Sequence, residues 1–445
     1  MNVVTEPAMS TRYHDEGAFE QRARNRDLTI AVIGLGYTGL PLAHAFAAAG
    51  FRVEGVDIDE TKLELLRRGE SYLPDISDEQ LRAIAGRLSL AAGPHSVADA
   101  DVVVMCVPTP VTADEQPDLT FVDTALSSVT PMIRPGTVLI LQSTVPPGTT
   151  RRWADRLAAE RALTLGEDLF VACAPERVNP ANRDGWTVTN TPRVVGGSTP
   201  ACTHRAATVL RSIAMEVAVL SDATVAEMSK LLENSARLVN ISFSNEISDL
   251  CHKLGVPVDE VIRAAATKPF GYLPHWPGPG IGGECIPVDP LFLIDEADRQ
   301  SVHLQVIEAA HRQASRRPLT VVDRVRQLLA RRGIPTEGSR VLLVGVTYKA
   351  NVPDLRNAPA LTIIDRLLAH GARVEYCDPW AGRIEVGGTT LSSTEVQHLR
   401  LDEYDCVVLV TPHDALQGHI DWHRATAVLD TVHQLPPGRA NVERL

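Results

Sequence analysis

The glycine pattern that begins at Gly34 constrains the fold of this chain more than any other feature. Residues 28–50, LTIAVIGLGYTGLPLAHAFAAAG, read as an apolar strand, a glycine turn and a helix of small residues. In such a unit Gly34 makes the tight turn, Gly36 lets the backbone approach a pyrophosphate, and Gly39 lets the helix pack on the strand. A second apolar strand reaches Asp57, 23 residues after Gly34, where a carboxylate accepts hydrogen bonds from the adenosine ribose and disfavours a 2′-phosphate. A glycine turn without a cofactor is the alternative, but the pattern predicts an NAD-binding domain. The expected cofactor contacts are Gly34, Gly36, Tyr37, Thr38, Gly39 and Asp57.

Three further apolar runs each end in polar residues. They are DVVVMCVPTP (101–110), GTVLILQSTVPPGTT (136–150) and FVACAPERVNP (170–180). Ligands of open α/β sheets bind at the carboxyl ends of the strands, so polar residues there are site candidates, although each taken alone could be an ordinary loop residue. These candidates are Thr109, Thr144, Glu176 and Asn179.

Composition excludes several classes of function. The 445 residues suffice for about two to three domains, and a net charge of −12 argues against a nucleic-acid or anionic membrane partner. The seven cysteines are dispersed, without a Cys-x-x-Cys pair or a Cys/His cluster, which predicts reduced thiols and no metal site. No apolar run approaches the roughly 18 residues of a membrane span, and the N-terminus lacks the pattern of a signal peptide. We therefore expect a cytoplasmic protein.

Changes in character along the chain indicate its domain organisation. Residues 1–27 have mixed charge and no periodicity, and we expect a flexible leader. Residues 28–214 alternate strands and helices, residues 215–332 are mainly helical, and residues 333–445 return to strands and helices after the break Gly333-Ile-Pro335. The expected fold class is α/β, with two Rossmann-like doubly wound domains joined by a long central helix and a small helical domain.

The central helix is expected over residues 223–255, ATVAEMSKLLENSARLVNISFSNEISDLCHKLG. Thr224 and Glu227 can form a capping box at its start, and Gly255 can end it. Some thirty residues of helix would span about 45 Å, so this helix would connect domains or pack against a copy of itself. Two further helices are expected at about 257–266 and 295–332.

Two basic or amide-bearing pairs are candidate ligand contacts. Lys230 and Asn234 lie four residues apart and therefore on one face of the central helix. Lys230 is either a solvated surface lysine or, because its neighbours are apolar, a donor inside a site. In the last domain only Gly345 follows the first apolar strand, SRVLLV, so we expect no second dinucleotide there. Lys349 and Arg356 would instead suit a diphosphate or nucleotide.

The loop Gly278-Pro-Gly-Ile-Gly-Gly-Glu-Cys285-Ile-Pro-Val-Asp289-Pro290 places one thiol among glycines and prolines. Most of these positions carry little side chain, so the backbone can lie close to a ligand. Asp289 follows Cys285 by four residues and could act as a base for water or as an orienting acceptor. An ordinary half-buried cysteine is the alternative.

Six segments resemble those of a known family, the UDP-glucose/GDP-mannose dehydrogenases. They are GLGYTGLPLA, STVPPGTT, PERVNP, AEMSKLLEN, PGPGIGGECIPVDP and TYKANVPDLRNAP, in the family's order and at its spacing, within residues 28–432. The cysteine loop is the most specific of them. Val288 stands where the UDP-glucose enzymes usually have lysine, which resembles the branch that acts on UDP-N-acetylmannosamine or UDP-N-acetylglucosamine.

The resemblance implies an NAD-dependent, four-electron oxidation of the C6 alcohol of a UDP-N-acetylhexosamine to the uronate. Cys285 would add to the intermediate aldehyde, and water would cleave the thioester formed by the second oxidation. Lys230 and Asn234 would stabilise the alkoxide or oxyanion. Waters would be positioned or deprotonated by Asp289, Glu176 and Thr144. Implied cofactor contacts are Thr109, Thr144, Lys349 and Arg356, and implied substrate contacts are Glu176, Arg177, Val178, Lys230, Asn234, Tyr272, Gly282 and Lys349. The expected partners are a UDP-sugar and, through the central helix, a second copy or a larger homo-oligomer.

Two positions depart from the family. Glu284 stands where a neutral residue or histidine is more usual, and its charge would disfavour a thiolate at Cys285. Asn357 stands where glutamate is common, and the segment TKPFGYLPHWPG has no clear counterpart of the arginine that related enzymes contribute across a dimer. The alternatives are a UDP-glucose 6-dehydrogenase, a two-electron dehydrogenase, which would not need the nucleophile, and a non-catalytic nucleotide-sugar binding protein.

Overall fold

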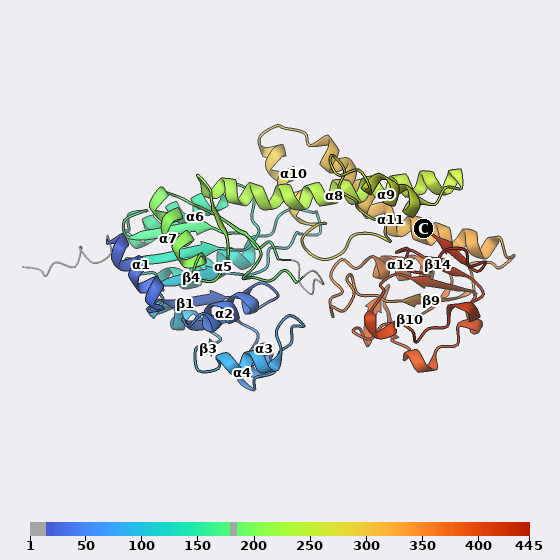
Figure 1. The fold of residues 1–445 in the computed structure, drawn as a ribbon, viewed down its shortest axis with the longest axis horizontal. Coiled ribbons are helices and arrows are strands. Elements are labelled where there is room, and N and C mark those ends of the chain that lie inside the picture. The colour runs from blue at the N-terminus through green and yellow to red at the C-terminus, as the bar shows by residue number, and fades with distance from the viewer. Residues whose placement is uncertain (1–14, 179–184) are drawn as a thin grey trace, which may run out of the picture. The chain divides into compact units, whose positions relative to one another are not determined.

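A computed structural model describes residues 15–178 and 185–445 of the chain. It consists of two compact units, Met1–Leu232 and Glu233–Leu445, called the N-terminal and the C-terminal unit below. Each unit is built around a sheet whose strands are mainly parallel (Figure 1).

The sheet of the N-terminal unit has eight strands in the order β3-β2-β1-β4-β5-β6-β7-β8. They are β1 (Thr29–Ile33), β2 (Arg52–Val56), β3 (Leu88–Ala91), β4 (Val102–Met105), β5 (Thr137–Leu141), β6 (Leu169–Cys173), β7 (Arg193–Gly197) and β8 (Val217–Val219). Every neighbouring pair is parallel except β6 and β7. The strand order reverses between β1 and β4, and ligands of open α/β sheets bind beyond the carboxyl ends of the strands at this point.

Helices cover both faces of this sheet. They are α2 (Gly39–Ala48), α3 (Glu60–Arg67), α4 (Asp78–Ile84), α5 (Thr120–Val129), α6 (Thr149–Arg161) and α7 (Pro200–Leu210). Successive side chains of a strand point to opposite faces. Ile30 and Val32 of β1 therefore join a hydrophobic cluster with α2 and α7, whereas Ala31 and Ile33 join another with α5 and α6.

The segment expected to be a flexible leader contains a helix, α1 (Glu16–Asn25). It buries Phe19 and Ala23 in the core of the N-terminal unit. The guanidinium of Arg205 on α7 lies 4.8 Å from the centre of the Phe19 ring. The leader prediction does not hold for residues 16–25, because a short helix with two buried side chains leaves little periodicity in its sequence.

Four helices follow the first sheet. They are α8 (Ala223–Leu254), α9 (Val258–Ala266), α10 (Asp289–Arg299) and α11 (Gln305–Ala330). The expected long helix is present as α8, the yellow-green helix of Figure 1. The single helix expected at about 295–332 is instead α10 and α11, and the break between them includes Ser301 with a φ of 57°.

The capping box expected at the start of α8 is absent. Asp222 accepts a hydrogen bond from the Thr224 N–H at 2.7 Å. The Glu227 carboxylate accepts instead from the N–H groups of Gly148 and Thr150, at 2.6 and 2.7 Å. Glu227 therefore satisfies donors at the start of α6, which no local sequence pattern could indicate.

The C-terminal unit contains a five-stranded parallel sheet in the order β10-β9-β13-β14-β15. Its strands are β9 (Arg340–Val344), β10 (Arg373–Cys377), β13 (Cys406–Leu409), β14 (Val428–Asp430) and β15 (Val442–Arg444). Helix α12 (Pro359–Ala369) and a hairpin of β11 (Arg383–Val386) and β12 (Thr389–Ser392) complete it. Short 3-10 turns lie at Pro94–Asp99, Thr130–Met132, Val396–His398, Leu401–Glu403, Asp414–Leu416 and Trp422–Arg424. The expected α/β class with two Rossmann-like sheets and a central helix is confirmed.

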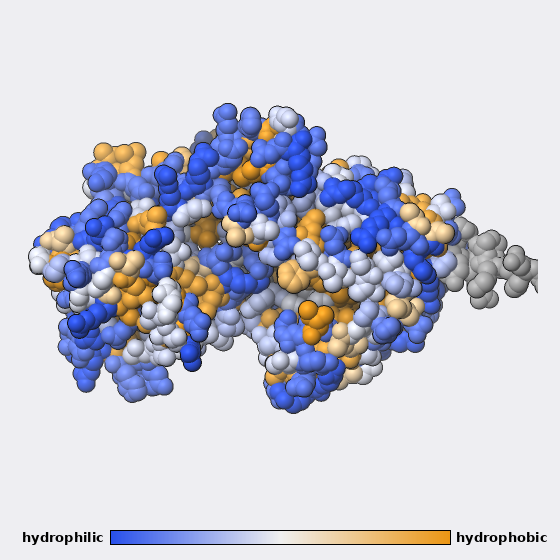
Figure 2. All heavy atoms as spheres, turned by 180° about the vertical axis from the view of Figure 1, so that it is seen from behind, coloured by the Kyte–Doolittle hydropathy of each residue, from blue (hydrophilic) through white to orange (hydrophobic). Residues whose placement is uncertain are grey.

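The surface drawn in Figure 2 is mainly hydrophilic, with small scattered apolar areas. Within residues 15–178 and 185–445, no helix is both long and apolar enough to cross a bilayer.

Candidate active site

The three glycines of the first turn have three different surroundings. Gly34 has a φ of 87°, and a Cβ there would lie 2.8 Å from the carbonyl oxygen of Cys106. A Cβ on Gly39 would lie 1.8 Å from the Gly34 oxygen, whereas a Cβ on Gly36 would meet no atom within 4 Å. Gly34 and Gly39 are therefore needed for the turn and for helix packing, and only Gly36 opens onto free space.

Helix α2 begins directly after this turn, and its N-terminus is open to an anion. Thr38 makes no side-chain cap, and the first turn of α2 contains no acidic residue. Uncapped N–H groups and the helix dipole favour negative charge at this position. The turn and the start of α2 therefore fit the pyrophosphate of a dinucleotide.

Asp57 closes the turn from the end of β2. Its carboxylate is buried and accepts from the N–H groups of Leu35 and Asp59, at 2.8 and 2.9 Å. The Tyr72 hydroxyl donates to the Leu35 carbonyl, and burial followed by the charge of Asp57 raises the pKa of Tyr72. Asp57 is thus held at the position that a ribose-binding carboxylate requires.

The other strand-end candidates of the N-terminal unit lie at the same edge of the sheet. Thr109 and Thr144 are half-buried and follow β4 and β5. The Ser143 hydroxyl joins the two strand ends by donating to the Val107 carbonyl at 2.6 Å. Asn179 lies outside the described residues.

Glu176 follows β6 and is held by several donors. One carboxylate oxygen accepts from the N–H groups of Arg177 and Val178, at 2.8 and 2.9 Å, and the other from Nη2 of Arg193 at 3.0 Å. Burial alone would raise the pKa of Glu176, but Arg193 and these N–H donors bring it below its usual value. Glu176 is therefore a persistent carboxylate, better suited to orienting a group than to removing a proton.

Lys230 and Asn234 lie one turn apart on α8, and both side chains are buried, with exposures of 9% and 4%. The reading of Lys230 as a solvated surface lysine is therefore wrong. In the C-terminal unit, the Asn234 amide donates to the carboxylate of Asp289, the first residue of α10.

Cys285 is exposed, and the other six cysteines of the chain are buried. Its carbonyl accepts from the Asp289 N–H at 2.8 Å, so the thiol sits immediately before α10. The glycines before it have a packing role that the sequence analysis missed. A Cβ on Gly282 would lie 2.5 Å from Cβ of Tyr348, and one on Gly283 would lie 3.0 Å from the Tyr348 ring.

Arg356 joins the cysteine loop to the segment that follows β9 in the sheet of the C-terminal unit. Its guanidinium pairs with Asp354 at 2.6 Å and also with Glu284. Its carbonyl accepts from the Gly283 N–H at 2.9 Å, and the Asn357 amide donates to the Gly283 carbonyl at 2.9 Å. The hydrogen bond to Asp354, with the charges of Glu284 and Asp354, raises the pKa of Arg356. The charge of Glu284 beside Cys285 is therefore countered within the same unit.

The two remaining candidates, Lys349 and Tyr272, are described by their burial and their neighbours along the chain. Lys349 is half-buried and lies four residues after Gly345, the glycine that follows β9 as Gly34 follows β1. Tyr272 is half-buried in a segment that exposes Phe270 and Leu273.

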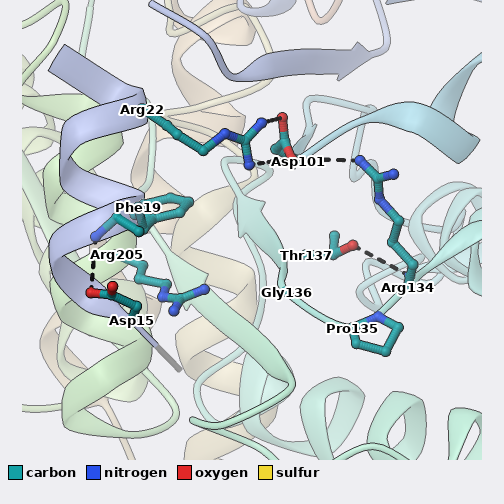
Figure 3. A pocket seen from close by; sticks show the side chains of 10 residues that line it. Asp15, Phe19, Arg22, Asp101, Arg134, Pro135, Gly136, Thr137 and Arg205 are labelled. Carbon is teal, nitrogen blue, oxygen red and sulfur yellow. Dashed lines mark hydrogen bonds and ion pairs between the residues drawn. The ribbon is translucent and has the colours of Figure 1, made fainter. Parts of the chain in front are cut away.

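A separate pocket of the N-terminal unit lies away from the glycine turn (Figure 3). Arg22 of α1 and Arg134 both pair with Asp101, at 2.7 and 3.5 Å. Asp101 precedes β4 and Gly136 precedes β5, so the pocket is at the amino ends of the strands. Cofactors of parallel sheets bind at the opposite end.

A dinucleotide cradle at the strand-order reversal, with an acidic residue after β2, is typical of NAD-dependent dehydrogenases. The sequence profiles of a single family match along the chain. They are those of the UDP-glucose/GDP-mannose dehydrogenase family, with the NAD binding domain at residues 28–214, the central domain at 224–315 and the UDP binding domain at 342–437.

Individual relatives agree with these profiles. The chain is 37% identical over 399 residues to UDP-N-acetyl-D-mannosamine dehydrogenase of Escherichia coli (strain K12), which covers 86% of this chain and 93% of the relative. It is 33% identical over 398 residues to UDP-N-acetyl-D-glucosamine 6-dehydrogenase of Pseudomonas aeruginosa, covering 89% and 90%. The solved structure of a UDP-D-ManNAc dehydrogenase from Pyrococcus horikoshii has a TM-score of 0.85 at 30% identity and covers 94% of this chain and 98% of that one. The chain belongs to the UDP-glucose/GDP-mannose dehydrogenase family. The resemblance, the NAD cofactor and the class of NAD-dependent nucleotide-sugar dehydrogenase are confirmed.

Proposed function

We propose that this chain is a UDP-N-acetylhexosamine 6-dehydrogenase, which oxidises the C6 alcohol of UDP-N-acetylmannosamine or UDP-N-acetylglucosamine to the carboxylate. The observation that carries the proposal is the exposed thiol of Cys285, set immediately before α10 in the same unit as the Asn234–Asp289 pair. The names of the Escherichia coli and Pseudomonas aeruginosa relatives support an N-acetylated sugar.

The overall reaction converts the alcohol, two NAD⁺ and water to the carboxylate, two NADH and three protons. NAD supplies the hydride acceptor for each of the two oxidations. Between them, the Cys285 sulfur bonds to the aldehyde carbon while the carbonyl oxygen takes up the thiol proton, which gives a thiohemiacetal. Loss of the second hydride gives a thioester on Cys285, and water then breaks the carbon–sulfur bond and regenerates the thiol.

The proposed catalytic roles follow from donors and acceptors of the chain. Lys230 and Asn234 donate to the oxygen on C6 as it gains negative charge. Asp289 orients the Asn234 amide, which fixes the donor before charge develops. Asp289 also accepts a proton from the hydrolytic water, while Glu176 and Thr144 orient the waters.

The proposed binding roles extend the same assignment. The cofactor contacts are Gly34, Gly36, Tyr37, Thr38, Gly39, Asp57, Thr109, Thr144, Lys349 and Arg356, and the substrate contacts are Glu176, Arg177, Val178, Lys230, Asn234, Tyr272, Gly282 and Lys349. Because Arg356 already pairs with two carboxylates, one of these ion pairs opens before its guanidinium holds the anionic part of a ligand. We assign domains to residues 28–214, 215–332 and 333–445, after a leader of residues 1–27 in which α1 is helical.

The chain acts as a dimer or larger homo-oligomer through α8. Leu232, Phe243, Leu250 and Leu254 are exposed on this helix, with exposures of 65%, 55%, 55% and 66%. Their spacings of 11, 7 and 4 residues place them on one face, and an apolar stripe of this kind favours a second copy. A cytoplasmic location is supported by seven cysteines that are all thiols.

The first test is the amount of NADH formed per UDP-sugar consumed, with UDP-N-acetylmannosamine, UDP-N-acetylglucosamine, UDP-glucose and GDP-mannose. We expect two NADH per N-acetylated sugar, and a loss of turnover of at least about 1,000-fold in Cys285→Ser, since a hydroxyl is a poorer nucleophile and leaving group. Cys251→Ala, at a buried cysteine of α8, is the control and should retain activity. One NADH per sugar, or full activity of Cys285→Ser, would exclude the thioester route. Turnover of UDP-glucose alone would overturn the substrate assignment, and no turnover of any sugar would favour a binding protein.

A further inference from the structure

Arg317 of α11 has the largest fully buried side chain of the described residues, with an exposure of 0%. Its Nε donates to the Gly278 carbonyl at 2.9 Å, and its Nη1 donates to Asp249 of α8 at 2.7 Å. The Gly278 N–H in turn donates to Oδ1 of Asn245, another fully buried residue of α8, at 3.0 Å. Side chains of two helices of the C-terminal unit therefore hydrogen-bond to both the N–H and the carbonyl of Gly278.

Stability alone does not explain this cluster. Nη2 of Arg317 and Nδ2 of Asn245 are buried and have no hydrogen-bond partner among the described residues. Unpaired buried donors cost free energy, and the Asp249 partner of Arg317 is 41% exposed, so solvent weakens this ion pair. The hydrogen bonds to Gly278 are therefore made at the cost of two unpaired donors, which stability alone does not account for.

Gly278 is the first residue of the loop that carries the nucleophile. Gly278 lies seven residues before Cys285. The chain just before it is also held, because the Ser244 hydroxyl of α8 donates to the His275 carbonyl at 2.6 Å. At its other end the loop is held at Gly283 by hydrogen bonds with Arg356 and Asn357. Between these two anchors, the backbone path that presents the thiol is largely determined.

We propose that Arg317 and Asn245 are positioning residues for the Cys285 loop, an inference that rests on the proposed role of Cys285 as the nucleophile. Their contribution is to keep the loop in one conformation before the substrate binds. Neither residue belongs to the motifs that the sequence analysis selected.

The test is amide hydrogen exchange of the ligand-free, full-length protein, followed over residues 278–288. Arg317→Met should speed exchange there by at least about tenfold without a comparable change in β9 or β13, because local opening becomes easier. Arg324→Met is the matched control. Arg324 is a buried arginine of the same helix that lies 3.9 Å from Glu443 and makes no recorded contact with the loop. A second pair of variants, at Asn245, keeps the proposal testable if Arg317→Met does not fold. Asn245→Leu should also speed loop exchange, whereas Asn245→Asp keeps an acceptor for Gly278 and should retain slow exchange.

Kinetics then separate positioning from a structural role. For Arg317→Met and Asn245→Leu we expect kcat to fall by about tenfold or more with a smaller change in KM, since the loop carries the reacting atom. Arg324→Met should change neither value. Unchanged loop exchange in both variants, or exchange that rises equally throughout the C-terminal unit, would overturn the proposal. Exchange is measured without substrate, so it decides this inference even if the proposed reaction fails.

Discussion

One ionic contact and two backbone N–H donors set the charge of the residue Glu176. Its side chain is 13% exposed beside β7, and Arg193, with an exposure of 3%, is its only ionic partner among the described residues. The other titratable group that senses this pair is the Cys106 thiol, whose pKa is raised by burial and then by Glu176. Cys106 is therefore a neutral thiol, and Arg193 alone balances the Glu176 charge.

Loss of Arg193 should change how both stability and activity depend on pH. Because the pKa of Glu176 is lowered in the folded protein, the pair stabilises fully above the usual value of 4.5 and loses this contribution as the pH falls through the lowered pKa. In Arg193→Met the buried carboxylate has no cation, so its pKa should rise above the usual value. We expect a loss of about 3–5 kcal/mol at pH 7 that shrinks toward pH 4, because one partner of a buried pair is left alone.

Urea unfolding from pH 4 to 8 measures the first effect, and the kcat profile measures the second. The acid limb of kcat should move to higher pH in Arg193→Met. Arg205→Met, which removes another buried arginine of the same unit with a more exposed partner, Glu16, should leave that limb in place. A parallel loss of stability at every pH would show that Arg193 acts only through packing.

At the scale of elements, both units contain the same hydrogen bond. In each, an aspartate that follows a strand accepts from a backbone N–H in the turn after the neighbouring strand. In the N-terminal unit, Asp57 after β2 accepts from the Leu35 N–H at 2.8 Å. In the C-terminal unit, Asp378 after β10 accepts from the Val346 N–H at 2.6 Å, but it also pairs with buried His413 at 3.0 Å. The following helix begins at Gly39 in the first unit and only at Pro359 in the second. A long loop therefore replaces the helix N-terminus that would face a pyrophosphate in the second unit.

The glycine turn allows binding and folding to be separated by two alanine substitutions. Gly36→Ala adds a Cβ in open space, so its thermal stability should stay close to that of the parent while the KM for NAD rises by about tenfold or more. Gly39→Ala places a Cβ 1.8 Å from the Gly34 oxygen and should lose about 2 kcal/mol or more of unfolding free energy. Thermal denaturation and NAD titrations measure the two effects. Equal stability losses in both variants would contradict the separate roles of these glycines.

At the scale of the whole molecule, the apolar stripe of α8 determines the predicted assembly. Phe243→Asp and Leu250→Asp place charges in the centre of the stripe and should yield monomers, because a buried unpaired carboxylate strongly disfavours the interface. Light scattering at several protein concentrations measures the mass, and circular dichroism reports whether the helices persist. Met215→Asp, at a residue with an exposure of 85% outside the stripe, should leave the mass unchanged. A parent protein that is monomeric at every concentration would end the proposal of assembly through α8.

The sequence alone determined the features that depend on neighbours along the chain. The strand, glycine turn and helix at residues 28–50, the long helix α8 and the thiol of Cys285 in its loop all follow from spacings of a few residues. Local backbone geometry and side-chain periodicity encode such features directly. The same local rules predicted the Rossmann-like fold, and the resemblance of six segments to a known family predicted the family.

Only the tertiary structure decided which distant side chains meet. Glu176 and its partner Arg193 are 17 residues apart, Arg317 and Gly278 are 39 apart, and Glu284 and Arg356 are 72 apart. Such pairs depend on the path of the backbone between them, and a buried arginine has the same sequence signature as an exposed one. Charge balance and loop positioning in the candidate site therefore became visible only in the packed structure.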